Sequence, residues 1–285
     1  MTAKTAEMRP HRKKISAGSV LIFLFCLVSA ALMVIPFLWM VSASFKLNKE
    51  IFTYDATFFP RQLHTVNYET VWGDIPFLQY FLNTAKLAVI ITMIQLVTCS
   101  LAAFSFSKLH YPGRDKLFLA YLATMMVPWH AIMIPQFIIV RSLGLYDTIW
   151  GSAICYLSAP MGVFLAKQFY LTFPRELDEA AALDGCSKFG TYMRVYLPLS
   201  TTIIATLTIT KGTQVWNDFF YPLIMTTSQR NNTLQLCLQL FKGSSTTHFN
   251  WLMAAATATS LPMVILYFSA QKYFVEGLQT TGMKN

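Results

Sequence analysis

An apolar stretch around residue 215 carries an unusual set of polar side chains, which are Lys211, Gln214, Trp216, Asn217 and Asp218. Amides and charged groups form hydrogen bonds, and an aromatic ring offers an apolar face. Together they could bind a neutral solute rich in hydroxyl groups, such as a sugar. Lys211 and Asp218 are seven residues apart, about two helical turns, which predicts that they share one helix face. The alternative is that this pair only holds neighbouring helices together.

A second polar stretch, residues 174–198, separates two apolar ones. Its first half is rich in helix-forming residues, and Asp184-Gly185 is a typical helix stop and turn. The small pair Ala180-Ala181 is expected to leave a flat surface that a partner can approach closely. The stretch is therefore predicted to form a helix–turn–helix with a docking surface. A solvated connector is the alternative.

The sequence shows no pattern of residues typical of catalysis or of metal binding. Its five cysteines form no Cys-x-x-Cys pair, and Cys26, Cys99 and Cys155 lie inside apolar runs, where they act as small hydrophobic residues. No Gly-x-x-x-x-Gly-Lys-Ser/Thr phosphate loop is present. We therefore predict no cofactor, no metal and no enzymatic activity for this chain, and any energy from ATP must come from another protein.

The composition indicates an integral membrane protein. Hydrophobic residues make up 55% of the chain and charged ones 12%, about half the charged fraction of soluble domains. The net charge of +9 would suggest nucleic-acid binding in a soluble protein. Here the position of the charges matters more, and no nucleic-acid partner is predicted.

The apolar runs predict an all-α fold with six transmembrane helices. A helix needs about 20 apolar residues to cross a bilayer. The runs cover residues 17–45, 84–107, 117–140, 148–166, 199–228 and 250–271. Prolines 128, 135, 160 and 262 predict breaks in the third, fourth and sixth helices, as in a bundle that lines a pathway and moves. Ordinary kinks are the alternative.

The distribution of basic residues predicts the orientation. Cytoplasmic loops carry an excess of lysine and arginine. Placing the N-terminus, 108–116, 167–194 and the C-terminal tail in the cytoplasm collects 14 of them there and leaves six in the outer segments. Both termini are therefore predicted to be cytoplasmic, and so is the polar stretch 174–198.

That polar stretch resembles the EAA loop of ABC importer permeases. The match consists of Glu179-Ala180-Ala181, Asp184-Gly185 and Leu197-Pro198. Val195 stands where the family usually has isoleucine, and Cys186 where alanine is common; both departures are mild. Other segments resemble the carbohydrate-uptake branch, similar to the smaller membrane subunit of the maltose transporter. They are residues 67–68, 80–84, 111–115, 125–128, 134–135, 216–219, 274–278 and 282–284.

The resemblance implies a type I ABC importer fold in the bacterial plasma membrane. It implies a cytoplasmic tail 1–16, a first transmembrane helix 17–45 and an extracytoplasmic loop 46–78. The permease domain would span 79–271 with the coupling loop 174–198, and 272–285 would be a cytoplasmic tail.

The resemblance also implies four partners besides lipid. They are a second homologous permease subunit, two ATPase subunits that bind ATP and magnesium, and an extracytoplasmic solute-binding protein. Glu179 would pair with a basic group of the ATPase, Gly185 would allow the turn, and Pro198 would fix the exit into the fifth helix. The outer segment 229–249 corresponds to a loop that contacts the binding protein in similar transporters.

Two other functions remain open. An ABC permease for glycerol phosphate or a polyamine would carry the same loop motif, although the third helix and the tail favour carbohydrate. An ion-coupled secondary transporter would need acidic residues within the membrane, where Asp218 is the one candidate. It would also leave the EAA-like loop unexplained.

Overall fold

The computed structural model describes residues 17–53, 57–242 and 247–282, with the backbone alone beyond residue 271. This part of the chain is helical and contains no strand. The long or medium helices are α1 (Ala17–Ser44), α4 (Phe77–Lys108), α5 (Arg114–Ala123), α6 (Trp129–Ser142), α8 (Pro160–Leu171), α12 (Thr201–Trp216) and α15 (Phe249–Gly282). The shorter elements are α2 (Asn48–Ile51), α3 (Val66–Gly73), η1 (Thr124–Met126), α7 (Ile149–Ile154), α9 (Glu176–Leu183), α10 (Lys188–Thr191), η2 (Tyr192–Tyr196), α11 (Leu197–Leu199), α13 (Phe220–Met225), η3 (Gln229–Asn231) and α14 (Leu234–Leu240).

Three of these helices are long and apolar enough to cross a membrane: Gly18–Ser44, Phe77–Lys108 and Phe249–Ser269. A fourth crossing is possible through α5 and α6, which meet at an angle of 98°. The predicted fourth and fifth spans are each divided, at residues 155–159 and 217–219. The all-α class is thus confirmed for the described residues, whereas the segments predicted as the third, fourth and fifth spans are each broken.

Proline explains some of the breaks. Pro128 precedes α6 and Pro160 is the first residue of α8, both positions where its missing N–H costs little. Pro135 and Pro262 lie inside α6 and α15 without interrupting them. The break expected in the sixth helix is therefore wrong, and α15 continues through Pro262 into the predicted C-terminal tail. The predicted tail 1–16 lies outside the described residues.

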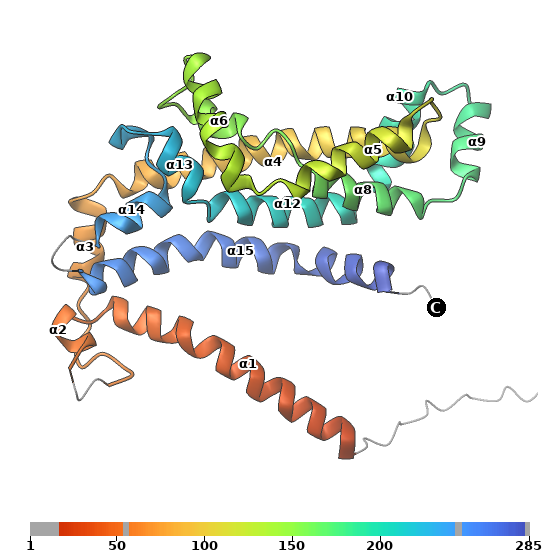
Figure 1. Ribbon diagram of the computed structural model, residues 1–285. Helices are drawn as coiled ribbons and strands as arrows, with labels where there is room; N and C mark the ends of the chain where they lie inside the picture. The colour runs from red at the N-terminus through yellow and green to blue at the C-terminus, as the bar shows by residue number, and fades with distance from the viewer. Residues whose placement is uncertain (1–16, 54–56, 243–246, 283–285) are drawn as a thin grey trace, which may run out of the picture.

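Helix α4 is the centre of the packing. Its buried side chains recur every three or four residues, as expected for a helix with neighbours along its whole length. One end of α4 contributes to a core shared with α14 and α15, and the other end to a core shared with α8 and η2. Both α8 and α12 lie along α4, and α15 packs against α12 (Figure 1).

Helix α1 stands apart. It meets α15 and then diverges from it (Figure 1), and its apolar side chains are exposed along most of its length. A helix that is apolar all round is suited to lipid or to a partner helix rather than to water.

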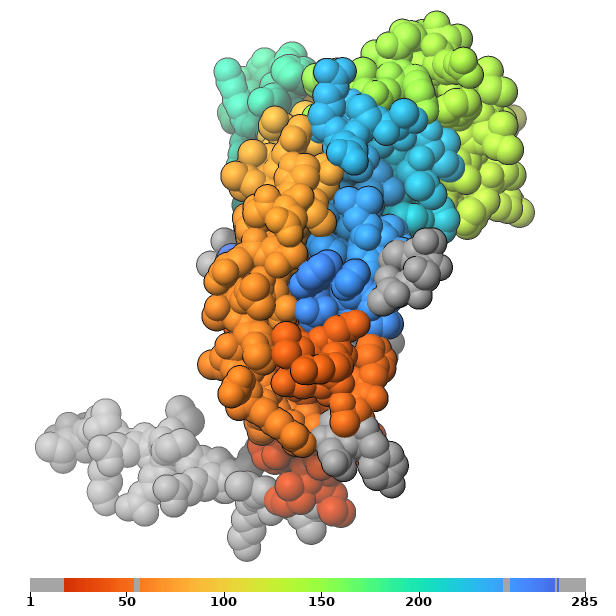
Figure 2. Space-filling view, turned by 90° about the vertical axis from the view of Figure 1, so that its left-hand side faces the viewer, coloured from red at the N-terminus to blue at the C-terminus, as the bar shows by residue number. Residues whose placement is uncertain are grey.

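The two ends of the bundle differ. One end carries α3, α14 and the start of α15, with α6 projecting beside them (Figure 2). The opposite end carries α9 and α10, and there α1 begins and α15 ends (Figure 1). The polar stretch 174–198 and the loops predicted to be extracytoplasmic therefore lie at opposite ends of the long helices.

Candidate functional site

The stretch 174–198 forms the predicted helix–turn–helix. Glu176, Asp178 and Glu179 lie in the first turn of α9, where negative charge favours the helix dipole. The helix ends in a Schellman motif, in which Cys186 N–H donates to Ala181 O (2.9 Å) and Gly185 N–H to Ala182 O (3.1 Å). Gly185 has φ +72°, a conformation that glycine adopts without strain.

A network that sequence reasoning missed anchors this loop to the end of α4. The Tyr196 hydroxyl donates to Asp178 Oδ1 (2.8 Å), and Lys108 Nζ lies 3.8 Å from Asp178 Oδ2. Lys108 also donates to Phe173 O (3.0 Å). Tyr196 is fully buried, and burial raises the pKa of its hydroxyl. No sequence signal marked Asp178, because its partners are distant along the chain.

The tip of the loop is exposed. Leu183 is 90% and Phe189 64% exposed, both large apolar side chains in a polar segment. Glu179 is exposed as well, and none of the three ion pairs among the described residues involves it. Their exposure makes this tip a candidate for an interaction site.

Two adjacent alanines of the motif differ in exposure. Ala180 is exposed, but Ala181 is 4% exposed and packs inward. The expectation that both form one flat surface is therefore wrong, since neighbouring residues of a helix lie about 100° apart. Asp184 and Pro198 are exposed and Leu197 is half-buried.

The polar residues of the fifth span are not gathered at one place. Lys211 and Gln214 line a cavity of about 240 Å³ between α4, η1, α8 and α12. Lys211 Nζ donates to Gln214 Oε1 (2.6 Å). A lysine at the centre of a bilayer costs about 2.5–3.5 kcal/mol, and a hydrogen bond from a charged group returns about 1.5–3 kcal/mol. The two ranges overlap, so the hydrogen bond to Gln214 can offset most of that cost.

The other three residues face elsewhere. Trp216 is buried, and its indole N–H donates to Thr259 O on α15 (3.0 Å). Asn217 lines a separate groove of about 370 Å³ against α14 and α15. Asp218 accepts a hydrogen bond from the Tyr156 hydroxyl and another from Phe220 N–H (3.1 Å).

The predicted shared face of Lys211 and Asp218 is wrong. Helix α12 ends at Trp216, so helical periodicity does not extend to Asp218. The two side chains form no ion pair in the described part of the chain. Tyr156, the partner of Asp218, was not anticipated, because residues 156 and 218 come together only through packing.

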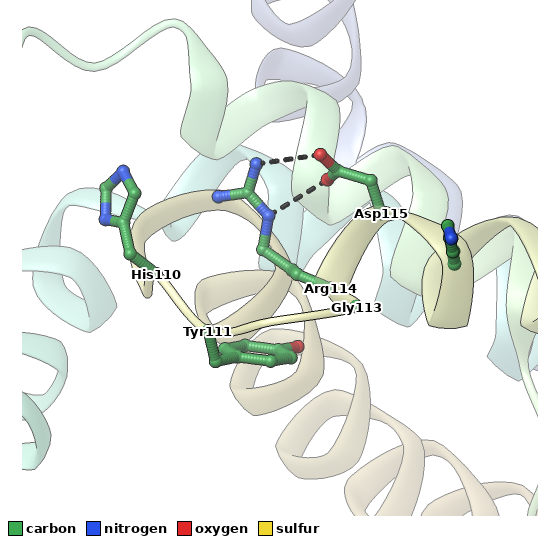
Figure 3. A pocket seen from close by; sticks show the side chains of 6 residues that line it. His110, Tyr111, Gly113, Arg114 and Asp115 are labelled. Atoms are coloured by element: carbon green, nitrogen blue, oxygen red, sulfur yellow. Dashed lines mark hydrogen bonds and ion pairs between the residues drawn. The ribbon is translucent and has the colours of Figure 1, made fainter.

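The turn between α4 and α5 forms a broad hollow of about 630 Å³ (Figure 3). Gly113 has φ +81°, and the Arg114 guanidinium donates to Asp115 (2.9 and 3.3 Å) and to Leu109 O (3.1 Å). Because these charges satisfy each other, we assign this hollow a structural role.

At the opposite end of the bundle, Asp147 holds the start of the segment that follows α13. Its Oδ1 accepts from the backbone N–H groups of Thr227 (2.9 Å) and Ser228 (3.0 Å), and also from the Asn231 amide (3.2 Å). These donors hold the pKa of the carboxyl well below its usual range, those of the two backbone groups contributing most. Within the described residues, no cluster of three or more histidine, cysteine or acidic side chains could hold a metal.

Comparison with known proteins places this geometry in a family. Residues 95–280 match the model of the binding-protein-dependent transport system inner membrane component. The chain is 30% identical to the ABC transporter permease protein YurM of Bacillus subtilis (strain 168), over 97% of this chain and 92% of that one. It is 29% identical to the arabinooligosaccharides transport system permease protein AraQ of Halalkalibacterium halodurans, over 90% and 92%.

A solved structure has a similar fold. It belongs to a bacterial ABC transporter involved in the import of the acidic polysaccharide alginate, and it matches with a TM-score of 0.80 at 22% identity. The match covers 94% of this chain and 100% of the other. At this identity the likeness concerns the fold.

Proposed function

The chain belongs to the family of binding-protein-dependent transport system inner membrane components, and on that premise we propose that it carries a sugar or an oligosaccharide as the permease subunit of an ATP-binding-cassette importer. Its relatives are permeases, so the chain is a multi-pass membrane protein and not itself an enzyme. The arabinooligosaccharide relative supports a carbohydrate substrate over glycerol phosphate or a polyamine.

The proposed topology has six membrane crossings with both termini in the cytoplasm. Helices α1, α4 and α15 would be unbroken crossings, and the α5–α6, α7–α8 and α12–α13 pairs would be broken ones. This arrangement is supported by the position of α9 at the end where α1 begins and α15 ends (Figure 1). It agrees with the excess of basic residues in the predicted cytoplasmic segments.

The coupling loop is proposed to dock on an ATPase subunit. The observation that carries this proposal is an exposed tip with Glu179, Leu183 and Phe189 on a firmly anchored base. Asp178 and Tyr196 connect α9 to the end of α4. A displacement of the tip would therefore move the bundle rather than bend the loop. Closure of the ATPases would then rock the helices as rigid bodies between inward- and outward-facing states.

Three kinds of partner complete this proposal. Two ATPase subunits would bind ATP and magnesium, and a second homologous permease subunit would complete the pathway. A solute-binding protein is supported by the family's dependence on one. The outer segment held by Asp147 would contact that protein.

The substrate path is proposed to run along the fifth span. Lys211 and Gln214 supply hydrogen-bonding groups in the cavity beside α4. Asn217 lines the neighbouring groove, while Trp216 and Asp218 fix the end of α12 through Thr259 and Tyr156.

Charge reversal at Glu179 tests the coupling role. In the reconstituted transporter, Glu179→Lys should abolish ATP-driven uptake while the protein remains assembled in the membrane. Glu176→Lys, the same reversal at another exposed position of α9, is the matched control and should retain most uptake. Normal uptake with Glu179→Lys would refute the assignment.

A further inference from the structure

The cavity between α4, η1, α8 and α12 has a mixed lining, in which polar side chains stand among apolar ones. Its polar lining consists of Thr92, Gln95, Ser158, Thr210, Lys211 and Gln214. The cavity opens at the molecular surface, because Ser158, Thr210 and Gln214 are exposed. Lys211 is the one charged residue of its lining, and the other polar groups are neutral.

The charge of Lys211 has no counter-charge within the described residues. None of their ion pairs includes it, and its hydrogen bond goes to a neutral amide. Asp218, the acidic residue nearest to it in sequence, interacts instead with Tyr156 and with Phe220 N–H. Cations within membrane proteins are usually paired, so an unpaired one inside a cavity indicates a place for an anion.

A second polar atom of the cavity lacks a partner. Thr92 is 94% buried, and its hydroxyl oxygen makes no hydrogen bond. It points toward α12, where it lies 3.9 Å from the position that a Cβ on Gly212 would occupy. Buried hydroxyl groups are nearly always hydrogen-bonded. This oxygen has almost no exposed surface, so we assign it no role in binding a ligand.

The volume limits what can enter. Pockets for drug-sized ligands measure about 300–1,000 Å³, whereas this cavity measures about 240 Å³. A Cβ added to Gly162 would lie 2.8 Å from Cys99 Sγ, so the wall formed by α8 already approaches α4 as closely as side chains permit. The cavity therefore suits one sugar unit and not an oligosaccharide.

We propose that this cavity is a subsite for a sugar unit that bears an anionic oxygen group, a carboxylate or a phosphate. Lys211 would pair with the anionic oxygen, and Gln214 would hold the ammonium group in place. This inference rests on the proposed function and narrows its substrate class to acidic sugars.

The test uses the complete transporter in nanodiscs, with all five native cysteines replaced and Ser158→Cys introduced at the mouth of the cavity. Labelling rates are compared for an anionic and a cationic methanethiosulfonate reagent. The anionic reagent should react about tenfold faster relative to the cationic one because of Lys211, and Lys211→Gln should remove this preference. Lys86→Gln is the matched control, since Lys86 is an exposed lysine of α4 outside the cavity lining.

Protection from labelling then identifies the ligand. Galacturonate, galactose 6-phosphate and galactose differ only at carbon 6. Galacturonate or galactose 6-phosphate should slow labelling at concentrations where galactose does not, and the one that protects identifies the anionic group. Equal protection by galactose, no protection by either anion, or a charge preference that persists in Lys211→Gln would overturn the proposal. Uptake of a neutral sugar by the same transporter, measured in parallel, would show that the proposed importer function stands when this inference fails.

Discussion

The proposed coupling loop and the cavity beside α12 differ in whether their charged side chains have partners within the chain. In the loop, Asp178 is paired within the chain, with Tyr196 and Lys108, and the exposed tip carries the groups that have no partner. In the cavity, Lys211 lacks an acidic partner although Asp218 is only seven residues away. From this difference we expect that paired charges stabilise the fold, whereas groups without a partner in this chain are the candidates for binding another molecule.

Removing the Tyr196 side chain, which is buried at the base of the loop, should lower the stability of the protein most. Tyr196→Ala deletes a fully buried ring and leaves Asp178 without its hydrogen bond, at a cost of about 3–5 kcal/mol of unfolding free energy. Tyr196→Phe keeps the ring and should cost about 1.5–3 kcal/mol, the value of a hydrogen bond to a charged group. Denaturant unfolding in detergent measures both, and equal stability of Tyr196→Ala and wild type would contradict the anchoring role.

Changing the exposed tip should leave stability nearly intact but remove function. Leu183→Ser replaces a side chain that is 90% exposed, so we expect a stability change within about 0.5 kcal/mol. ATP-driven uptake should nevertheless fall severely, because the docking surface loses an apolar contact. If uptake and stability instead fell together, Leu183 would be part of the fold rather than of an interface.

A substitution in the turn between α9 and α10 should lower the stability by an intermediate amount. Gly185→Ala meets no neighbouring atom within 4 Å, but φ +72° costs a residue with a Cβ about 1–2 kcal/mol. Thermal unfolding should shift accordingly, with partial loss of uptake. Gly73→Ala, also in open space but with ordinary helical φ, is the control and should not destabilise the protein.

Asp147 extends the comparison to the end of the bundle opposite α9. Its lowered pKa means that the ionised carboxyl stabilises the fold above the ordinary aspartate pKa of about 3.9, and that this contribution disappears as the pH falls through the lower folded value. Asp147→Asn should therefore be less stable than wild type at pH 7, and the difference should shrink in acid. A constant difference between pH 7 and pH 3 would show that ionisation of this group is not what stabilises the loop.

The sequence was sufficient for the features that depend on local patterns. The apolar runs at 17–45 and 84–107 correspond to α1 and α4, and Asp184-Gly185 ends α9 as predicted. The sequence was not sufficient to predict contacts between residues that are far apart in the chain, such as the one between Tyr156 and Asp218. The end of α12 at Trp216 also escaped prediction, because no proline or glycine marks it, and this moved Asp218 off the face of Lys211.

Cross-linking at the coupling loop tests the central claim most directly. In a cysteine-free background, Leu183→Cys and Ala181→Cys place a thiol at two positions of α9 that are two residues apart, one 90% exposed and one 4% exposed. In the assembled transporter, Leu183→Cys should cross-link to the ATPase subunit and Ala181→Cys should not. Cross-linking of Ala181→Cys alone, or of neither position, would contradict the claim that the unpaired tip is where the ATPase binds.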